Sequence, residues 1–255
     1  MDEPTMAEGC ALARPAVLER FGQGAPWRRT ALVAGERVAV LGSFDEPWAA
    51  QAALAGGFPG VRELTEIVEW LESNGPGPFM LTLRERFAAD DRWPAAGLAP
   101  VSREPVFAVD AAVPGCWPIA EPESLVRPPH DVEEFVYAYN SWVGHESAVR
   151  QLVVADDLRD PDKVFLVLDV DGSAVGTAIV SYAAGTGYVS GIGVDPDHRR
   201  QGYGGALTRA AARAAGRGGD PVWLHASVEG SPLYRQLGFR QVDTQVTLVR
   251  PVRAG

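Results

Sequence analysis

Hydrophobic and polar positions alternate most regularly in the second half of the chain. Apolar residues recur at three- and four-residue intervals over 130–144, which predicts an amphipathic helix with Asp131 as its N-cap. Three β-rich runs follow over 163–194, separated by Asp-Gly and Gly-Thr-Gly. Because these are hairpin residues, they predict three antiparallel strands in a meander. From Ala206 the alanine-rich segment predicts a helix that ends at a glycine pair.

Shorter patterns complete this half. The apolar run 222–227 predicts a strand, and the alternating run 241–249 predicts a last one. Between them, residues 231–239 predict a short helix with Ser231 as N-cap and Pro232 at the first helical position. The resulting order is helix, meander, helix, strand, short helix and strand.

A proline-rich segment separates this half from the first. Five prolines lie between residues 110 and 129, where hydrophobic periodicity is weak. We therefore expect a domain boundary at residues 111–122, with one domain over 1–115 and another over 122–255. The first domain is predicted to be α+β, with helices around 46–56 and 61–73 and strands around 37–43 and 79–85.

Composition limits the classes of partner. The chain has 255 residues, 46% of them hydrophobic, enough for a sizeable core. A net charge of -10 argues against nucleic-acid binding, so an anion site must be local. Cys10 and Cys116 lack metal-ligand spacing, so no metal is expected. The acidic N-terminus and the absence of a run of about 18 apolar residues predict a cytoplasmic protein without a membrane span.

One loop carries most of the chemistry. Residues 194–206 read VDPDHRRQGYGGA, between a predicted strand and a predicted helix. The first N–H groups of a helix lack internal partners, glycines let the backbone approach a ligand, and Arg199 and Arg200 add donors, so the loop predicts a pyrophosphate site. No Gly-Lys-Ser/Thr follows, and Leu207 stands where a dinucleotide fingerprint needs glycine. The alternative is a glycine-rich helix start with two solvated arginines.

This loop and a second motif make residues 122–250 resemble the GNAT (Gcn5-related N-acetyltransferase) superfamily, whose members bind acetyl-CoA. The superfamily's R/Q-x-x-G-x-G/A loop is matched by Arg199, Arg200, Gln201, Gly202, Tyr203 and Gly204, and its LYxxLGF-like segment by Leu233, Tyr234, Leu237, Gly238 and Phe239. The resemblance implies an α/β fold whose mixed, mostly antiparallel sheet is flanked by helices. It also implies acetyl transfer from acetyl-CoA, without a metal, to a primary amine on a small molecule or peptide.

The resemblance also implies roles for individual residues. The N–H of Ile192 is expected to face the thioester oxygen, and Tyr234 is expected to protonate the departing thiolate. The expected coenzyme-binding residues are Ile192, Gly193, Val194, Arg199, Arg200, Gln201, Gly202, Tyr203, Gly204 and Gly205.

The base that deprotonates the amine stays open, because the strand over 185–194 contains no acidic residue. The candidates are His145, Glu146 and His225, with the alternative that the first two are ordinary surface residues and the third is structural. Ser190 and Ser227 could orient a water molecule, and His198 is expected to face phosphate or solvent. The recurrent Arg209, Arg213 and Arg217 predict a solvated helix face. The missing carboxylate keeps a second hypothesis open, a non-catalytic acyl-CoA sensor or interaction module, and a longer acyl donor is a third.

A weak internal repeat links the two halves. Residues 97–109 echo 238–249, with a valine four residues after the glycine in both. The first half then resembles a degenerate GNAT domain, with Trp93 in the place of Tyr234 and no coenzyme loop. The alternative is an unrelated α+β domain with a chance echo. In either case we expect it to wall the acceptor site or to bind a partner.

Overall fold

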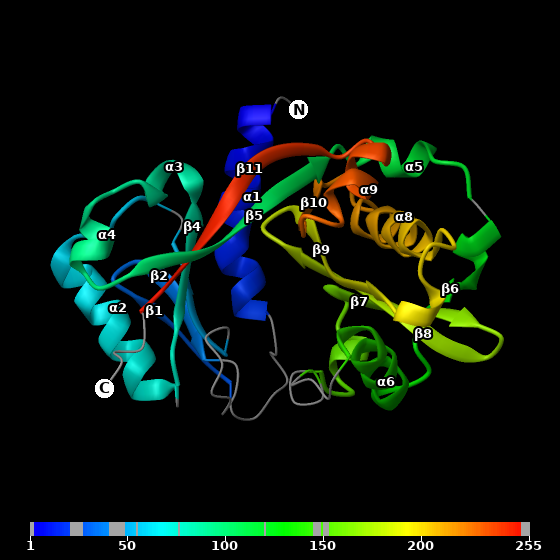
Figure 1. The fold of residues 1–255 in the computed structure, drawn as a ribbon, viewed down its shortest axis with the longest axis horizontal. Helices are drawn as coiled ribbons and strands as arrows, with labels where there is room; N and C mark the ends of the chain where they lie inside the picture. The colour runs from blue at the N-terminus through cyan, green and yellow to red at the C-terminus, as the bar shows by residue number, and fades with distance from the viewer. Residues whose placement is uncertain are drawn as a thin grey trace.

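The computed structural model describes residues 3–20, 28–40, 49–54, 56–75, 77–119, 121–144, 149 and 153–250. These residues form one eleven-stranded, largely antiparallel sheet with helices on both faces, which confirms the predicted mixed α/β class (Figure 1). The strand order is β1-β2-β3-β4-β11-β5-β10-β9-β8-β7-β6. The strands are β1 (Arg29–Val33), β2 (Glu36–Val40), β3 (Ala50–Ala53), β4 (Met80–Arg84), β5 (Ala99–Val109), β6 (Val126–Arg127), β7 (Lys163–Val170), β8 (Ser173–Ala183), β9 (Thr186–Val194), β10 (Val222–His225) and β11 (Arg240–Val249).

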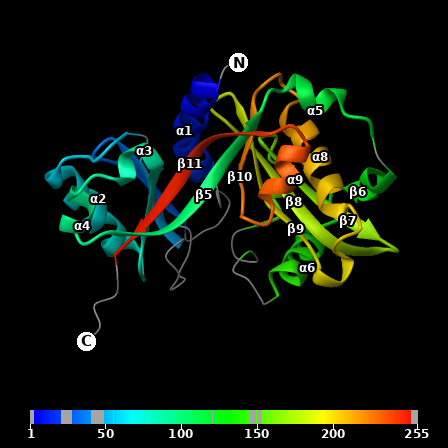
Figure 2. The ribbon, with the colours of Figure 1, turned by 45° about the horizontal axis from the view of Figure 1, so that its top comes forward.

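Helices cover the sheet in two layers. In the second half, α8 and α9 pack on one face, around Leu207, Leu224 and Phe239, and α6 packs on the other, around Phe135 and Phe165. Helix α1 crosses the middle of the sheet on the α6 side (Figures 1 and 2). The α-helices are α1 (Glu3–Arg20), α2 (Val61–Asn74), α3 (Glu85–Ala88), α4 (Arg92–Ala95), α5 (Ala112–Cys116), α6 (Val132–Val143), α8 (Tyr203–Ala215) and α9 (Ser231–Gln236).

The last strand of each half lies beside the other half. β11, at the C-terminal end of the described chain, pairs antiparallel with β4 and β5. β5 in turn pairs antiparallel with β10, so it separates β10 from β11 (Figure 1). The sheet is therefore continuous across the chain. The predicted boundary at residues 111–122 falls on α5 and the segment before β6, and it stays a prediction.

The two halves repeat the same succession of pairings. Strands β1 to β4 pair antiparallel, antiparallel and parallel, as β7 to β10 do. α2 lies between β3 and β4 as α8 lies between β9 and β10. The segments that echo each other in sequence occupy equivalent places: Leu98 donates its N–H to the Trp93 carbonyl at 3.0 Å, and Phe239 donates to the Tyr234 carbonyl at 3.0 Å. Trp93 is thus the structural counterpart of Tyr234.

Several predicted elements are confirmed and others are wrong. The meander, both helices around it and the strands β10 and β11 are present, although α8 begins three residues before Ala206. The helix predicted at 46–56 is wrong, because β3 occupies its centre and is buried along its length. Ser231 is not the N-cap of α9 but its first helical residue, so Pro232 is the second and not the first as predicted. Gly230 is the cap, and the Ser231 hydroxyl donates to the Ser227 carbonyl at 2.9 Å.

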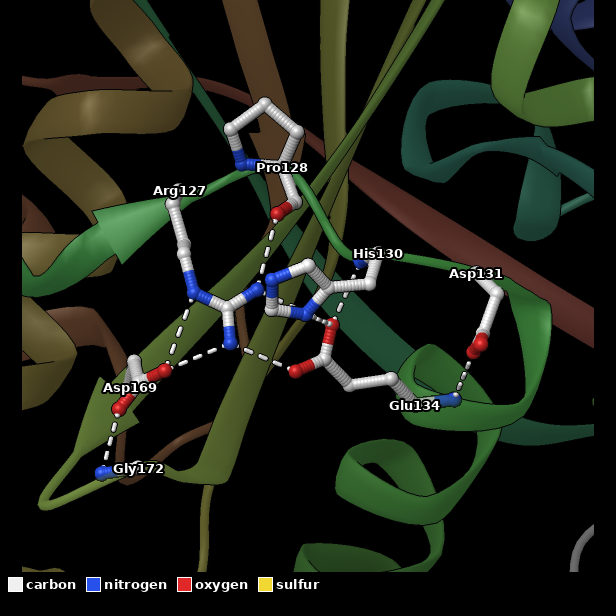
Figure 3. A network of polar contacts seen from close by, with 7 residues as sticks. All are labelled: Arg127, Pro128, His130, Asp131, Glu134, Asp169 and Gly172. Atoms are coloured by element: carbon white, nitrogen blue, oxygen red, sulfur yellow. Dashed lines mark hydrogen bonds and ion pairs between the residues drawn. The ribbon is translucent and has the colours of Figure 1, made fainter.

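A polar network fixes the start of α6 (Figure 3). Asp131 accepts a hydrogen bond from the N–H of Glu134 at 2.8 Å and is the N-cap, as predicted. The Arg127 guanidinium bridges the carboxylates of Glu134 and Asp169 at 2.6 Å each. Arg127 therefore ties β6, α6 and the β7–β8 turn together, which sets the position of α6 over the sheet.

Candidate active site

A wedge opens in the sheet where β9 and β10 separate. These parallel strands pair from Gly187/Val222 to Val189/Leu224 and no further. β10 continues along β5, through His225 opposite Val106 and a hydrogen bond from the Ala226 N–H to the Pro105 carbonyl. On that side, residues 190–194 of β9 have no paired strand in the described part of the chain. Backbone groups are thus left for an extended ligand.

A β-bulge shapes the wall of this wedge. Between the pairs Ile179/Ser190 and Thr177/Gly193, both Gly191 and Ile192 stand opposite one residue of β8. Gly191 has a φ of 58°, a left-handed conformation that suits glycine. Its carbonyl accepts a hydrogen bond from the Thr177 hydroxyl at 2.8 Å. The bulge is thereby held in one geometry at the predicted position of the thioester.

Trp142 supports the same wall from α6. Its Nε1–H donates to the Thr177 hydroxyl oxygen at 2.9 Å, so a chain of two hydrogen bonds runs from α6 to the bulge. A Cβ at Gly193 would lie 2.0 Å from the indole Cδ2, so only glycine fits under this ring. The glycine at 193 therefore allows α6 to brace the wall.

The glycine loop lies at the start of α8. Gly202 has a φ of 83° and is the N-cap, and the first helical bond runs from the Ala206 N–H to the Gly202 carbonyl. The N–H groups of Tyr203, Gly204 and Gly205 precede that bond and point out of the helix end. This is the geometry that receives an anion, and the positive end of the helix dipole favours it.

The two arginines of the loop differ in their surroundings. Arg199 donates its Nε–H to the Val194 carbonyl at 2.9 Å, so part of its donor set braces the loop against β9. Arg200 is exposed and has a φ of 66°, a strained value for a side chain that has a Cβ. His198, in the 3₁₀ turn η4 (Pro196–His198), has Nδ1 3.3 Å from the Asp195 carboxylate. This contact between His198 and Asp195 was not predicted from the sequence.

Tyr234 is buried on α9, beside Phe107 and Phe239. Burial, followed by the effect of a charge on Tyr188, raises the pKa of Tyr234 to about 12. Its hydroxyl makes no hydrogen bond with the described residues. It is thus a protonated and uncommitted donor, as a leaving-group acid must be.

The candidates for a base are only partly brought together. His145 and Glu146 lie outside the described residues. Ser227 accepts a hydrogen bond from the Gly230 N–H, which gives it a role in the turn before α9. Ser190 and His225 lie at the mouth of the wedge, the former at the last β8–β9 pair before the bulge and the latter at the end of β10.

The predicted arginine face of α8 is not simply solvated. Glu123 is buried and forms ion pairs with Arg209 and Arg213, and Arg213 also donates to the carbonyls of Pro114 and Trp117. Arg217 lies over the Tyr182 ring, 4.4 Å from its centroid. Arg209 and Arg213 thus fasten the segment between the halves onto α8, which a sequence pattern alone could not reveal.

Comparison with known proteins agrees with this geometry. The family model for the acetyltransferase (GNAT) domain matches residues 161–241, which span the meander, the glycine loop, α8 and Tyr234. The second half of the chain contains a GNAT domain. The wedge, the bulge and the glycine loop all lie within the matched residues, and the predicted resemblance is confirmed for this half.

Individual relatives of the GNAT domain were found among curated proteins and solved structures. The chain is 35% identical over 97 residues to a mycothiol acetyltransferase from Clavibacter sepedonicus and 34% identical over 110 residues to one from Nocardiopsis dassonvillei. The matches cover 36% and 38% of this chain and 32% and 33% of those proteins. The chain thus matches about a third of the length of these curated relatives.

A solved structure extends the likeness over both halves. A GCN5-related N-acetyltransferase from Kribbella flavida superposes with a TM-score of 0.69 and 25% identity, over 96% of each chain. A second one, from Sphaerobacter thermophilus, shares the fold with a TM-score of 0.56 and 21% identity, over 85% of this chain and 77% of that one. Among the described residues, the structure has no helix that is both long and apolar enough to cross a bilayer.

Proposed function

We propose that the chain transfers an acetyl group from acetyl-CoA to a primary amine of a small molecule or peptide by direct attack. The observation that carries the proposal is the wedge between β9 and β10, with a fixed bulge on its wall and the open N–H groups of α8 nearby. The names of the relatives support acetyl transfer.

The residues present fit acetyl-CoA. The N–H groups of Tyr203, Gly204 and Gly205 would hold the diphosphate, with Arg200 exposed beside them. Unpaired backbone groups of β9 would receive the pantetheine arm, and the N–H of Ile192 would stabilise charge on the thioester oxygen. Tyr234 would give its proton to the sulfur. Acetyl-CoA supplies an activated acyl group, and the chain's own residues bind it, orient it and move protons.

A non-catalytic acyl-CoA sensor is the second candidate, because β9 contains no carboxylate. A sensor would use the same wedge and loop but would need no acid with a free hydroxyl. The uncommitted Tyr234 hydroxyl therefore favours the enzyme. A longer acyl donor would use the same groups.

For the first half we propose a degenerate GNAT domain that contributes to the acceptor side. The repeated succession of pairings and the matched positions of Trp93 and Tyr234 support this. Trp93 is buried and donates its Nε1–H to the Phe87 carbonyl at 2.9 Å. Its one polar side-chain group is used in that bond, and an indole has no hydroxyl that could serve as an acid.

Gly204→Val tests the coenzyme site. A Cβ at residue 204 would meet only Leu233, at 3.7 Å, so folding should be nearly unaffected. The added side chain lies at the helix end, where a diphosphate must approach, so we expect affinity for acetyl-CoA to fall at least tenfold by titration calorimetry. The control is Gly115→Ala, because a Cβ added at residue 115 would meet no heavy atom within 4 Å. Unchanged affinity in Gly204→Val would contradict the assignment of the loop.

Thiol release separates the enzyme from the sensor. The full chain is incubated with acetyl-CoA and a panel comprising a polyamine, an amino sugar, a lysine-containing peptide and amines related to mycothiol. Release of coenzyme thiol that depends on one of these amines supports the enzyme. Binding of acetyl-CoA without release by any of them supports the sensor.

A further inference from the structure

Two polar side chains meet where β9 and β10 separate, on the sheet face covered by α1. Tyr188 is paired with Trp223, just before the strands part, and His225 is the next residue of β10 on that face. The Tyr188 hydroxyl lies 3.0 Å from Nδ1 of His225. Their rings meet edge to face with centroids 5.6 Å apart. The wedge thus has a hydrogen-bonded tyrosine and histidine at its mouth.

The other side of the imidazole is also held. Because Nδ1 faces Tyr188, Nε2 is the nitrogen available for the hydrogen bond to Gln245. The Oε1 atom of Gln245 accepts a hydrogen bond from the Arg14 Nε–H at 3.1 Å. The Nε2 atom of Gln245 lies 3.5 Å from the Glu104 carboxylate. With its proton on Nε2, the ring directs the Nδ1 lone pair at the Tyr188 hydroxyl.

Tyr188 also lies within electrostatic reach of the proposed acid. Burial first, and then a charge on Tyr188, raise the pKa of Tyr234, on α9, and of Tyr139, on α6. Three phenols from β9, α9 and α6 thus interact electrostatically. Of these, Tyr188 is the one that contacts a histidine.

A small cavity connects the histidine to the surface of α1. It has a volume of about 40 Å³, enough for a few water molecules. His225, Arg14, Thr244 and Gln245 are among the residues that line it. A proton on the imidazole thus has a route away from the wedge that water can occupy.

We propose that Tyr188 and His225 together are the general base that takes the proton from the acceptor amine, which rests on the acetyl transfer proposed above. As the nitrogen–carbon bond forms, the amine proton passes to the Tyr188 oxygen while the Tyr188 proton passes to Nδ1 of His225. The carbon–sulfur bond breaks with its electron pair on sulfur, which takes the Tyr234 proton. The imidazolium then loses its proton through the cavity, and solvent reprotonates Tyr234.

The charge environment keeps this base unprotonated. Burial first, and then the positive charge of Arg14, lower the pKa of His225 well below its usual value, against the hydrogen bond that His225 donates to Gln245. The titratable groups around it are Arg14 and Cys10 from α1, Glu104 from β5, Arg84 from β4, Asp243 from β11 and Tyr188 from β9. His225 is therefore neutral at pH 7, and kcat/KM should fall only when the pH drops through its lowered pKa.

The test compares His225→Gln and Tyr188→Phe in the full chain, with the best amine of the panel. We expect kcat to fall at least about 10²-fold in each variant. The double variant should fall no further, because each single change already disables the same relay. Affinity for acetyl-CoA should stay within twofold by calorimetry. Matched controls are His130→Gln and Tyr137→Phe, two exposed residues at α6 that should retain wild-type kcat.

Arg14→Gln gives a readout that a purely structural role would not move. Without the guanidinium the pKa of His225 should rise, so the acid limb of kcat/KM should shift to higher pH. The imidazole resonances of His225 should shift likewise in an NMR titration without coenzyme.

Three results would overturn the relay. These are kcat within threefold of wild type in His225→Gln or Tyr188→Phe, an unchanged acid limb in Arg14→Gln, and a His225 that titrates at or above the usual histidine pKa. If the wild-type chain releases thiol with none of the amines, the proposed function fails instead. The NMR experiment separates the two failures: a proton on Nε2 shows that the Tyr188–His225 pair has the proposed arrangement, and a proton on Nδ1 overturns the relay on its own.

Discussion

Gly193→Ala tests whether α6 sets the geometry of the wedge. The added Cβ would lie 2.0 Å from Cδ2 and 2.2 Å from Cε2 of Trp142, far inside van der Waals contact. Both atoms belong to the rigid fused ring, and the indole is fixed by its hydrogen bond to Thr177. Either the indole or strand β9 must therefore move.

The cost follows from these contacts. Overpacking of this kind costs about 1–3 kcal/mol, and loss of the Trp142–Thr177 hydrogen bond adds about 1 kcal/mol. We expect the free energy of unfolding to fall by about 2–4 kcal/mol and Tm by roughly 4–16 °C. Because Thr177 also holds the Gly191 carbonyl, the bulge should loosen and kcat should fall with stability.

Urea unfolding followed by tryptophan fluorescence gives the stability, and thiol release gives the activity. Gly115→Ala is the control for a glycine with free space around it. In a Trp142→Ala background, Gly193→Ala should cost almost nothing further, because the clash is gone. A loss below about 0.5 kcal/mol in the wild-type background, or an equal loss in both backgrounds, would refute the reasoning.

Two further predictions concern single groups. Tyr234→Phe should lower kcat about 10²-fold and change the free energy of unfolding by less than about 1 kcal/mol, because the hydroxyl has no hydrogen bond with the described residues. Thiol release measures the first effect and thermal unfolding the second. A kcat within threefold of wild type would contradict the role of Tyr234 as the acid. Arg127, followed by the His130 N–H, lowers the pKa of Glu134 from 4.5 to about 2. The ionised Glu134 carboxylate contributes to the free energy of unfolding above pH 4.5, and this contribution is lost as the pH falls toward 2. Glu134→Gln should therefore flatten the pH dependence of the free energy of unfolding, measured with urea, between pH 4.5 and 2. An unchanged slope would count against the network.

The second half was predictable because its signals are local. The Asp131 cap, the hairpin turns and the glycine loop each act within a few residues, and all lie where the pattern placed them. In the first half, alanines at 50–53 favoured a helix, but burial on both faces of the sheet overrode that propensity. Helix α1 gave no usable periodicity and contains Pro15.

The candidate site was predictable in part for the same reason. The loop residues and Tyr234 belong to compact motifs. The pairing of His225 with Tyr188 was not predictable, because it joins residues 37 positions apart through strand register. One signal was available: Tyr188, Trp223 and His225 alternate with buried aliphatic residues, which places them on one face once β9 and β10 are paired.

The exchanged strands make the stability of each half depend on the other. β5 belongs by sequence to the first half, yet it is the neighbour that β10 keeps after β9 has turned away at the wedge. A fragment starting at residue 122 would lose that neighbour and the edge against which the wedge opens. Either half without the other would thus lose the wedge, even with every motif residue intact.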